Sequence, residues 1–587
     1  MSNPSSRISR DHKASFTPVN NFRPHRERKD NPDDRKSTKK CQSRDTTNSV
    51  QIDDDDSNRR QKRNGLSLDD RTRTICDTPL CKLDASLISM ACRTMNTLAK
   101  IGRKDSPMIV EKILKRIIDE ENVGNPHAVA TTSMYTTAIS AWAKSKGKAG
   151  PQRAEEILKI MMAQHSSGNI NVAPETATFN AVINAWSKSS NIQGAERAEE
   201  ILAWMEQMSN TNGVNVKPNT ISYNTAIDAW ARSGAEGAPQ KAEYLLKKME
   251  ELYRNGDTEV KPNVRSCNTV LNSWAKSSKV GAAKRAEEIL AWMEIASTFN
   301  TEMRPTVVSY NAVIDAYARS DDSDKAQKAQ AVFNRMKEPN TISYNVLMNA
   351  WCKSNSVGSA EMAESILTGM EKRYLSGDDN ATPDSISYNT VICAFIYSKE
   401  KGSSLKALEI IYRMVVMFKN GNKKIELNVR YFNIVLRGLA NDTQDLAVHA
   451  ENLLWQMEEL QEAGIKKSSP NTSSYIYIIK AWIKLLSRDR ILRAEYILRH
   501  MESFNQDGNV RCAPTKFCYS LIVDAWIELG DAFANEHLSQ FLKQMKKVNV
   551  SDSVENEGRD ARSYNRHYKP RRKHSFPSES REDSPVS

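Results

Sequence analysis

The stretch KPNTISYNTAIDAWARSG, Lys217–Gly234, decides the fold because close copies of it recur along the chain. Tyr223, Ile227 and Trp230 follow the spacing i, i+4, i+7, which places them on one face of a helix. Pro218 ends the preceding segment and prepares the start of that helix. The asparagine after Tyr223 is unexpected there, because asparagine is roughly half a kcal/mol worse than alanine inside a helix. Its recurrence at the same position requires an explanation.

The copies are marked by an aromatic residue, once replaced by cysteine, at nearly constant intervals. These positions are Tyr135, Phe179, Tyr223, Cys267, Tyr310, Tyr344, Tyr388, Phe432, Tyr475 and Tyr519. The successive intervals are 44, 44, 44, 43, 34, 44, 44, 43 and 44 residues. Ten matches at nearly one period indicate a solenoid of repeated units.

Each unit contains a second apolar stripe of helical period after a turn rich in Ser, Gly and Lys. In the third unit this stripe is Ala242, Leu245, Leu246 and Met249. A helical hairpin cannot bury such stripes alone, so neighbouring units must stack, and the Trp and Met positions are expected in the core. A weaker hairpin, with stripes around Met95 and Ile113, is expected to cap the N-terminal end. The predicted fold is therefore an all-α solenoid of about ten helix-turn-helix repeats.

The predicted solenoid spans residues 81–545 and lies between two basic tails, residues 1–80 and 546–587. Their net charges of +5 and +3 leave only +4 of the overall +12 for the body, whose charge alone does not indicate a ligand. The tails contain few large apolar residues and are expected to be disordered, and the run Asp53–Asp56 is read as a solvated acidic segment. The first 26 residues weakly resemble a mitochondrial transit peptide, although a basic disordered tail explains them equally well.

Several classes of protein are disfavoured by composition and motifs. No apolar run approaches the 18 residues of a membrane span, and nine cysteines without a CxxC pair argue against a zinc site or a disulfide framework. There is no P-loop, HExxH or GxSxG motif. His25-Arg26-Glu27 has the H-x-E letters of a zinc deaminase but lacks the required cysteines. We therefore expect a non-enzymatic binding protein without metal or cofactor.

The pattern P-N-x-x-S-Y-N-T-x-I-x-A-W-x-K-S…A-E-x-I-L…M resembles the pentatricopeptide repeat (PPR) family over about 420 residues. The units depart from that family in length, since its repeats have about 35 residues. HEAT-like repeats have a similar length to these units but lack the Tyr-Asn and Pro-Asn signature. The resemblance implies a right-handed α-solenoid that binds single-stranded RNA, roughly one base per repeat. It also implies an organellar location, mitochondrial or plastid, with a role in RNA processing, stabilisation or expression.

The resemblance assigns base reading to two side chains per unit. The first follows the aromatic residue and is expected at Thr136, Asn180, Asn224, Asn268, Asn311, Asn345, Asn389 and Asn433. The second closes the unit and is expected at Asn219, Asn263, Thr306, Asn340, Asp384, Asn428 and Asn471. Ile476 and Glu175 depart from the family's usual choices at these positions. Units two to eight all carry asparagine at the first position, which in the family goes with a pyrimidine-rich target.

Both sets of residues also have a purely structural interpretation. A polar residue just after proline is what a helix N-cap requires, an interaction of about 1 kcal/mol. A cap does not explain an asparagine further into the helix, but a hydrogen bond to the neighbouring repeat would. These alternatives stay open at the level of the sequence.

A second series of residues is basic and lies nine positions after the aromatic residue. Its members are Lys144, Lys188, Arg232, Lys276, Arg319, Lys353 and Lys484. Stacking of the units would align these cations beside the asparagine row, as single-strand binding requires and as the resemblance implies for phosphate contacts. A favourable interaction with the helix dipole explains a lysine at a helix C-terminus equally well. The expected partner is single-stranded RNA, with RNA-processing proteins recruited in trans, and the alternative is a scaffold that binds proteins.

Overall fold

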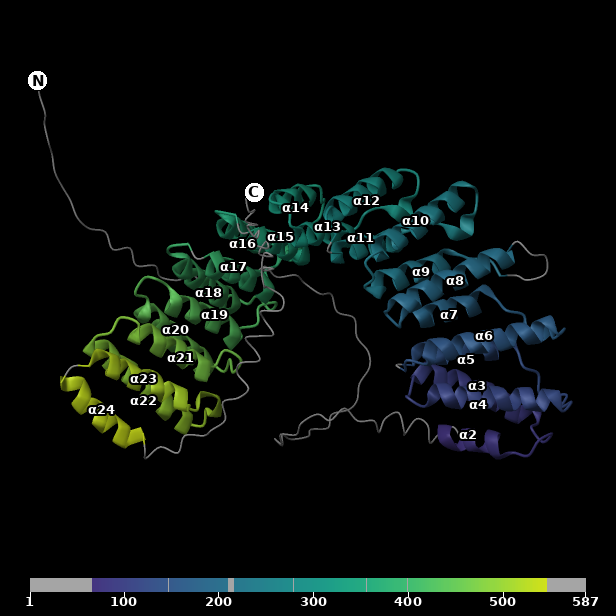
Figure 1. Cartoon of the computed structure of the whole chain (residues 1–587), viewed down its shortest axis with the longest axis horizontal. Coiled ribbons are helices and arrows are strands. Elements are labelled where there is room, and N and C mark those ends of the chain that lie inside the picture. Colours follow the sequence, from purple (N-terminus) through teal and green to yellow (C-terminus); the bar gives the residue numbers. More distant parts are fainter. Residues whose placement is uncertain are drawn as a thin grey trace, which may run out of the picture. The chain divides into compact units, whose positions relative to one another are not determined.

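The computed structural model describes residues 66–545 except 146, 210–215, 278, 355, 399 and 531. Every regular element among these residues is an α-helix or a short 3-10 helix. The chain divides after Ser67 into two units, and the helices α2 to α24 all belong to the second, Leu68–Ser587. They follow one another as antiparallel hairpins in chain order (Figure 1).

The first helix, α2 (Leu68–Asp77), corrects the predicted boundary of the N-terminal tail at residue 80. Its buried Ile75 packs at the hairpin formed by α3 (Ala85–Ile101) and α4 (Ser106–Asn122). The helix was missed because a single deeply buried side chain leaves almost no periodic signal in the sequence. The remainder of the two predicted tails, residues 1–65 and 546–587, lies outside the described residues.

Ten hairpins follow α3 and α4, one for each predicted repeat. Their helices are α5 (Thr132–Lys144) and α6 (Gly150–Ser166), α7 (Thr176–Ser187) and α8 (Ile192–Ser209), α9 (Thr220–Ser233) and α10 (Ala238–Arg254), α11 (Val264–Lys276) and α12 (Ala282–Ala296), α13 (Val307–Arg319) and α14 (Lys325–Asn334). The second half comprises α15 (Thr341–Ser354) and α16 (Ser359–Leu375), α17 (Ser385–Ser398) and α18 (Ser403–Lys419), α19 (Val429–Asn441) and α20 (Ala447–Glu462), α21 (Thr472–Ile483) and α22 (Arg488–Gln506), α23 (Lys516–Leu529) and α24 (Ala532–Met545).

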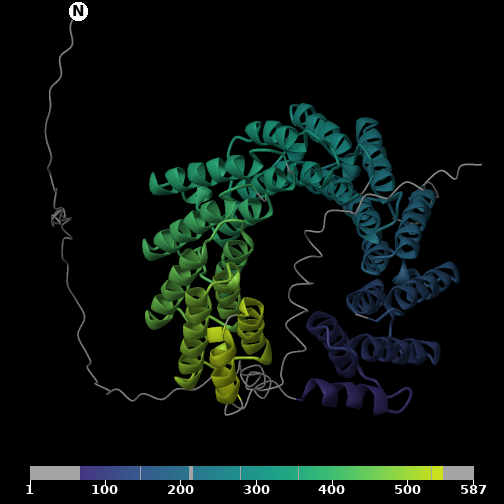
Figure 2. The same ribbon diagram turned by 60° about the vertical axis from the view of Figure 1, so that its left-hand side comes forward.

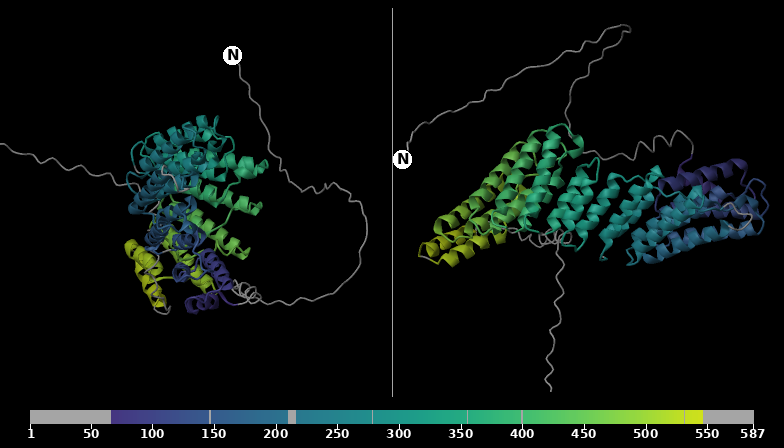
Figure 3. Two further views of the ribbon diagram at one scale, coloured as in Figure 1. Left: turned by 90° about the vertical axis from the view of Figure 1, so that its right-hand side faces the viewer. Right: turned by 90° about the horizontal axis from the view of Figure 1, so that it is seen from above.

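The hairpins stack so that the first helices form one layer. Each first helix contacts the first helix of the next unit, as α7 contacts α5 and α9. Each second helix packs against the first helix of its own unit and of the next, as α8 contacts α7 and α9. The same order of hairpins can be followed from other directions in Figure 2 and Figure 3. These contacts confirm the predicted α-solenoid.

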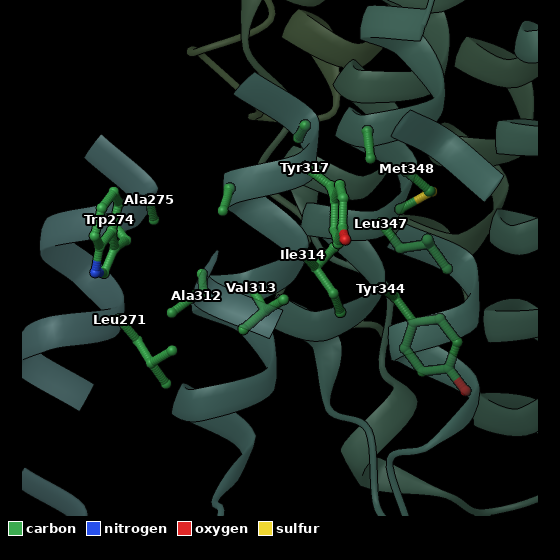
Figure 4. Packing of buried hydrophobic residues seen from close by; sticks show 14 of the residues in the cluster. Leu271, Trp274, Ala275, Ala312, Val313, Ile314, Tyr317, Tyr344, Leu347 and Met348 are labelled. Atoms are coloured by element: carbon green, nitrogen blue, oxygen red, sulfur yellow. The ribbon is translucent and has the colours of Figure 1, made fainter. Parts of the chain in front are cut away.

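The core consists of the predicted apolar stripes. Tyr223, Trp230, Ala242 and Met249 are all buried, and equivalent residues are buried in most other units. Figure 4 shows this packing, with the apolar side chains of α13 between those of α11 on one side and those of α15 on the other. The core is therefore continuous from one unit to the next, as stacked repeats require.

The long period has a visible structural cause. In five units a 3-10 turn precedes the closing proline, at η1 (Ile170–Val172), η2 (Thr258–Val260), η3 (Thr301–Met303), η4 (Asp379–Ala381) and η5 (Val510–Cys512). Each turn buries one residue against the core. The fifth repeat differs, because α14 is only 10 residues long and α15 begins soon after its end. This accounts for the single interval of 34 residues.

A recurring polar contact holds consecutive hairpins in register. Glu155 of α6 is buried and accepts hydrogen bonds from Trp186 Nε1 of α7 (3.0 Å) and Arg197 Nε of α8 (2.9 Å). The same contacts join Glu111 to Trp142 and Arg153, Glu243 to Trp274 and Arg285, and Glu451 to Trp482 and Arg493. We call this series the Trp–Glu–Arg ladder. Since each glutamate bonds to both helices of the following unit, the ladder fixes the position of one hairpin on the next.

Candidate functional site

The predicted site residues all belong to the first-helix layer or to the residues that cap it. The closing residues are helix N-caps. Asn219 Oδ1 accepts the backbone N–H groups of Ile221 (3.0 Å) and Ser222 (3.1 Å), and Ser222 Oγ accepts the N–H of Asn219 (3.1 Å). Asn263 and Asn471 form the same reciprocal box. The closing residues therefore do act as helix N-caps, but capping uses only their side-chain oxygen.

The asparagine after the aromatic residue is bonded to the next repeat in four units. Asn224 Oδ1 accepts a hydrogen bond from Ser266 Oγ at 2.5 Å. The same bond joins Asn268 to Ser309 (2.7 Å), Asn345 to Ser387 (2.7 Å) and Asn433 to Ser474 (2.7 Å). The serine is always the third helical residue of the following unit and belongs to its capping box. The hydrogen bond to the neighbouring repeat, left open by the sequence, is therefore present.

The direction of this bond fixes the orientation of the asparagine amide. Ser266 Oγ accepts the backbone N–H of Asn263 (3.3 Å), which can only donate. The serine must therefore offer its own hydrogen to another acceptor, and Asn224 Oδ1 is the closest one. As a result the oxygen of Asn224 is occupied and its Nδ2 group, a donor of two hydrogen bonds, is directed elsewhere.

The two predicted reading residues of a unit also meet each other. Asn345 Nδ2 donates to Asp384 Oδ1 (3.0 Å), and Asn433 Nδ2 donates to Asn471 Oδ1 (3.1 Å). Asn180 makes a longer contact of 3.4 Å with Asn219. The structure thus brings together pairs that are 38 or 39 residues apart in the sequence.

Four of the first eight units depart from this arrangement. Among the described residues, Asn180 Oδ1 and Asn311 Oδ1 are buried without a hydrogen-bond partner, and Asn389 makes only a 3.8 Å contact with Cys393 Sγ. Asn389 has no serine opposite it, because the equivalent residue of the next unit is Tyr431. In the first unit, Thr136 Oγ1 lies 2.9 Å from Thr178 Oγ1.

The basic series lies at the ends of the first helices. Lys144 Nζ donates to the carbonyl of Ala99 (2.8 Å) and Lys188 Nζ to that of Ala143 (3.0 Å), the last turn of the preceding first helix. These two lysines therefore do interact with the carbonyl end of a helix, as the dipole interpretation requires, but that helix belongs to the preceding unit. Desolvation lowers the pKa of Lys188, and the like charges of Lys144 and Arg232 lower it further. The cations of three consecutive units therefore lie near enough to affect the pKa of Lys188.

The remaining members of the basic series are less uniform. Arg232 pairs with Asp228 and Arg319 with Asp315, both at 2.8 Å. Lys276 and Lys484 are exposed. Desolvation lowers the pKa of Lys353, and although Asp315 raises it, the like charges of Arg319 and Lys325 lower it further. The aspartates reduce the positive field at two positions, a feature that the spacing of basic residues alone did not reveal.

One set of exposed residues was not predicted. Ile221, Val308, Ile342 and Ile386 are 55% to 60% exposed, each two residues before the aromatic position. They lie in the first helical turn beside the closing residue. Their signal in the sequence is an apolar residue that recurs outside the core stripe.

Membrane-spanning helices, metal sites and disulfides are all absent from the described part of the chain. None of its helices is long and apolar enough to cross a membrane. Residues 66–545, outside the gaps given above, contain no group of three or more His, Cys, Asp or Glu side chains that could hold a metal ion. The eight cysteines that the structure describes are reduced.

Two family models match the middle of the chain. A model described as the pentatricopeptide repeat domain matches residues 252–320, and one described as the PPR repeat family matches residues 305–353. No curated protein matches the chain. Among solved structures, the chain is similar to the pentatricopeptide repeat protein PPR10 in complex with an 18-nt psaJ RNA element and to a variant of it with three cysteines replaced by serine. In both cases the identity is 17%, 83% of this chain and 79% of the other are covered, and the TM-score is 0.29.

Proposed function

We propose that this chain, which matches pentatricopeptide repeat models, binds single-stranded RNA along its first-helix layer without catalysing a reaction. The observation that carries this proposal is the paired amide arrangement. A purely structural role would use the asparagine and closing residue only as partners of each other and of the backbone. Instead, the pairs Asn345–Asp384 and Asn433–Asn471 retain polar groups that have no hydrogen-bond partner among the described residues.

These remaining groups can be named atom by atom. In Asn345 and Asn433, one Nδ2 hydrogen is used on the closing residue and the second is available to a ligand. The closing residue Asn471 uses Oδ1 for the backbone of Ser474, so its Nδ2 is available as a donor. The closing residue Asp384 uses Oδ1 in the same way, and its Oδ2 is available as an acceptor.

The difference between Asn471 and Asp384 supports two pyrimidine preferences. Uracil presents N3–H, a donor, at the centre of its pairing edge, whereas cytosine presents an unprotonated N3, an acceptor. Asp384 therefore suits uracil in the sixth unit, and the asparagine closing residues suit cytosine. The closing residues therefore predict an order of uracil and cytosine along the strand, and not only a general preference for pyrimidines.

The other features of the layer fit the same ligand. The exposed Ile221, Val308, Ile342 and Ile386 provide apolar contacts for the faces of bases, which single-stranded RNA leaves accessible. The basic series provides counter-charges for phosphates. The exposed aliphatic side chains also favour the alternative of a scaffold that binds an extended peptide.

We include an organellar role in RNA processing or stabilisation in the proposal. It is supported by the resemblance to the family and by the basic composition of the first 26 residues. Expression of the chain with a fluorescent C-terminal fusion tests the location, and exclusive cytosolic fluorescence would contradict it.

Replacement of Asn224 by alanine separates a role in RNA binding from a purely structural role of this residue. The change removes the Nδ2 donor and one hydrogen bond to Ser266, so we expect RNA affinity to fall about tenfold, and stability to fall by no more than about 1 kcal/mol. Fluorescence anisotropy with a pyrimidine-rich RNA and thermal unfolding measure the two effects. Unfolding without a separate loss of affinity would instead assign Asn224 a purely structural role.

A further inference from the structure

The hairpin α3–α4, expected only to cap the solenoid, repeats the spacing of the units that follow it. Counting back 44 residues from Lys144 and Glu155 leads to Lys100 and Glu111. Glu111 accepts hydrogen bonds from Trp142 Nε1 (2.8 Å) and Arg153 Nε (2.9 Å), and so forms the first step of the Trp–Glu–Arg ladder. The hairpin is therefore stacked in the same register as a true repeat.

The junction of this hairpin with the first repeat contains a hollow of about 370 Å³. This volume lies within the range of roughly 300–1,000 Å³ that is usual for ligand sites. The hollow lies between α3, α5 and the start of α7. Its polar lining is Asn96 and Lys100 from α3, Thr132, Ser133, Thr136, Thr137, Ser140 and Lys144 from α5, and Glu175.

The charges in the hollow are incompletely balanced. Lys144 Nζ is hydrogen-bonded to the carbonyl of Ala99 and forms no ion pair with a carboxylate of the described residues. Lys100 is exposed and has no ion pair among the described residues. Thr137 Oγ1 donates its hydrogen to the backbone carbonyl of Ser133 (2.8 Å) and lies 3.1 Å from the amide of Asn96. The two ammonium groups of Lys100 and Lys144 form a suitable site for a phosphate.

We propose that this hollow binds a phosphate of the RNA strand, so that the RNA-binding surface extends past the ten repeats onto α3. The proposal rests on the proposed function. The hairpin contributes a cation through Lys100 but no reading amide, since Cys92 stands where Thr136 and Asn180 stand in the next two units. The added subsite therefore recognises the backbone of the RNA and not its base.

Substitution of Glu175 tests the proposal in the opposite direction, because it should raise the affinity for RNA. Its carboxylate lines the hollow, and no hydrogen bond or ion pair to its side chain is found in the described part of the chain. It repels a phosphate, so Glu175→Gln is expected to strengthen binding. If Glu175 instead read the base of the first repeat, the same change would weaken binding.

The experiment uses the full chain and a series of RNAs lengthened by one nucleotide at either end. We expect Lys100→Ala to weaken binding about threefold to tenfold only for RNAs long enough to reach the hairpin. Lys115→Ala, which removes the same charge from the exposed side of α4 in the same hairpin, is the matched control and should have no effect. Glu175→Gln should tighten binding at least twofold for the same long RNAs.

Two forms of each RNA identify the source of the phosphate. If a terminal phosphate on the shorter RNA restores the affinity of the longer one, the hollow binds a strand end. If only the additional nucleotide does so, it binds an internal phosphate, and both results support the subsite. Equal effects of Lys100→Ala at all lengths, or no effect, would overturn this inference alone. Failure of the unmodified protein to bind any RNA would overturn the proposed function as well.

Discussion

At the scale of single residues, one serine in four units links helix capping to the proposed reading of bases. Ser266 accepts the N–H of Asn263, which completes the capping box, and donates to Asn224 of the preceding unit. Capping therefore determines which end of the Asn224 amide is left for a ligand. The recurring asparagine is a poor helix former that is retained at a position where its amide is held by the next repeat.

Ser266→Ala tests this link, because it releases the amide of Asn224. We expect RNA affinity or base discrimination to fall about twofold to tenfold, the equivalent of one neutral hydrogen bond. Ser222→Ala is the control, since Ser222 belongs to the same kind of box but does not contact Asn180. Binding measured with RNAs that vary at one base should distinguish the two variants, and equal losses would contradict the role of the serine.

Asp384→Asn should change which base the sixth repeat prefers. The substitution replaces the available acceptor Oδ2 with a donor, so we expect the preference to move from uracil to cytosine at one position of the target. The ratio of affinities for two RNAs that differ only at that base measures the change. An unaltered ratio would show that Asp384 acts only as a helix cap.

The sequence could predict which residues occupy the site but not how they are connected. The period of 44 residues was sufficient to place Asn224 and Asn263 at corresponding places in each unit. The bond between Asn224 and Ser266 could not be predicted, because it joins two units and depends on their stacking. The pairing of Arg232 with Asp228 is different, because it lies within one helix at the spacing i, i+4 and was missed only because basic residues alone were counted.

At the scale of elements, the Trp–Glu–Arg ladder explains how hairpins keep a common register. Burial alone would raise the pKa of Glu155, but hydrogen bonds from Arg197 and Lys159 outweigh it and lower the pKa to about 2. The carboxylate is therefore ionised when it holds Trp186 and Arg197. The sequence predicted the helices from their apolar stripes, but the glutamates resemble ordinary surface residues there, and their burial arises only when units stack.

Glu155→Ala should destabilise the solenoid on the order of 3 kcal/mol, because Arg197 and Trp186 lose a buried partner. Glu156→Ala, which removes the neighbouring exposed carboxylate, is the control and should cost less than about 1 kcal/mol. Chemical denaturation measures both changes. A similar loss for the two variants would show that the ladder does not stabilise the stack.

The contribution of Glu155 should also depend on pH. The folded pKa of about 2 is lower than the ordinary value of 4.5, so the stabilisation is complete above pH 4.5 and is lost as the pH falls toward 2. The difference in melting temperature between the unmodified protein and Glu155→Gln should therefore shrink over that interval. A difference that is constant from pH 6 to pH 2 would contradict the ionised state of Glu155.

At the scale of the whole molecule, the basic series should act through the sum of its charges. Replacing Lys144, Lys188 and Lys276 by alanine removes three cations from the first-helix layer, so the slope of log affinity against log salt should become shallower by about 2 for single-stranded RNA. The control variant has the same net charge, because it replaces three other lysines by alanine. These are Lys112, Lys115 and Lys284, which are exposed on second helices. Equal slopes for the two triple variants would place the phosphate path elsewhere.

The most direct test of RNA binding by the asparagine row is selection of the full chain against a random pool of single-stranded RNA at moderate salt. We predict enrichment of a pyrimidine-rich sequence in which uracil occupies the position of the sixth repeat and cytosine predominates at the others. Enrichment for purines would contradict the base assignment. The absence of any enriched sequence would contradict the central claim that this solenoid is a sequence-selective RNA-binding protein.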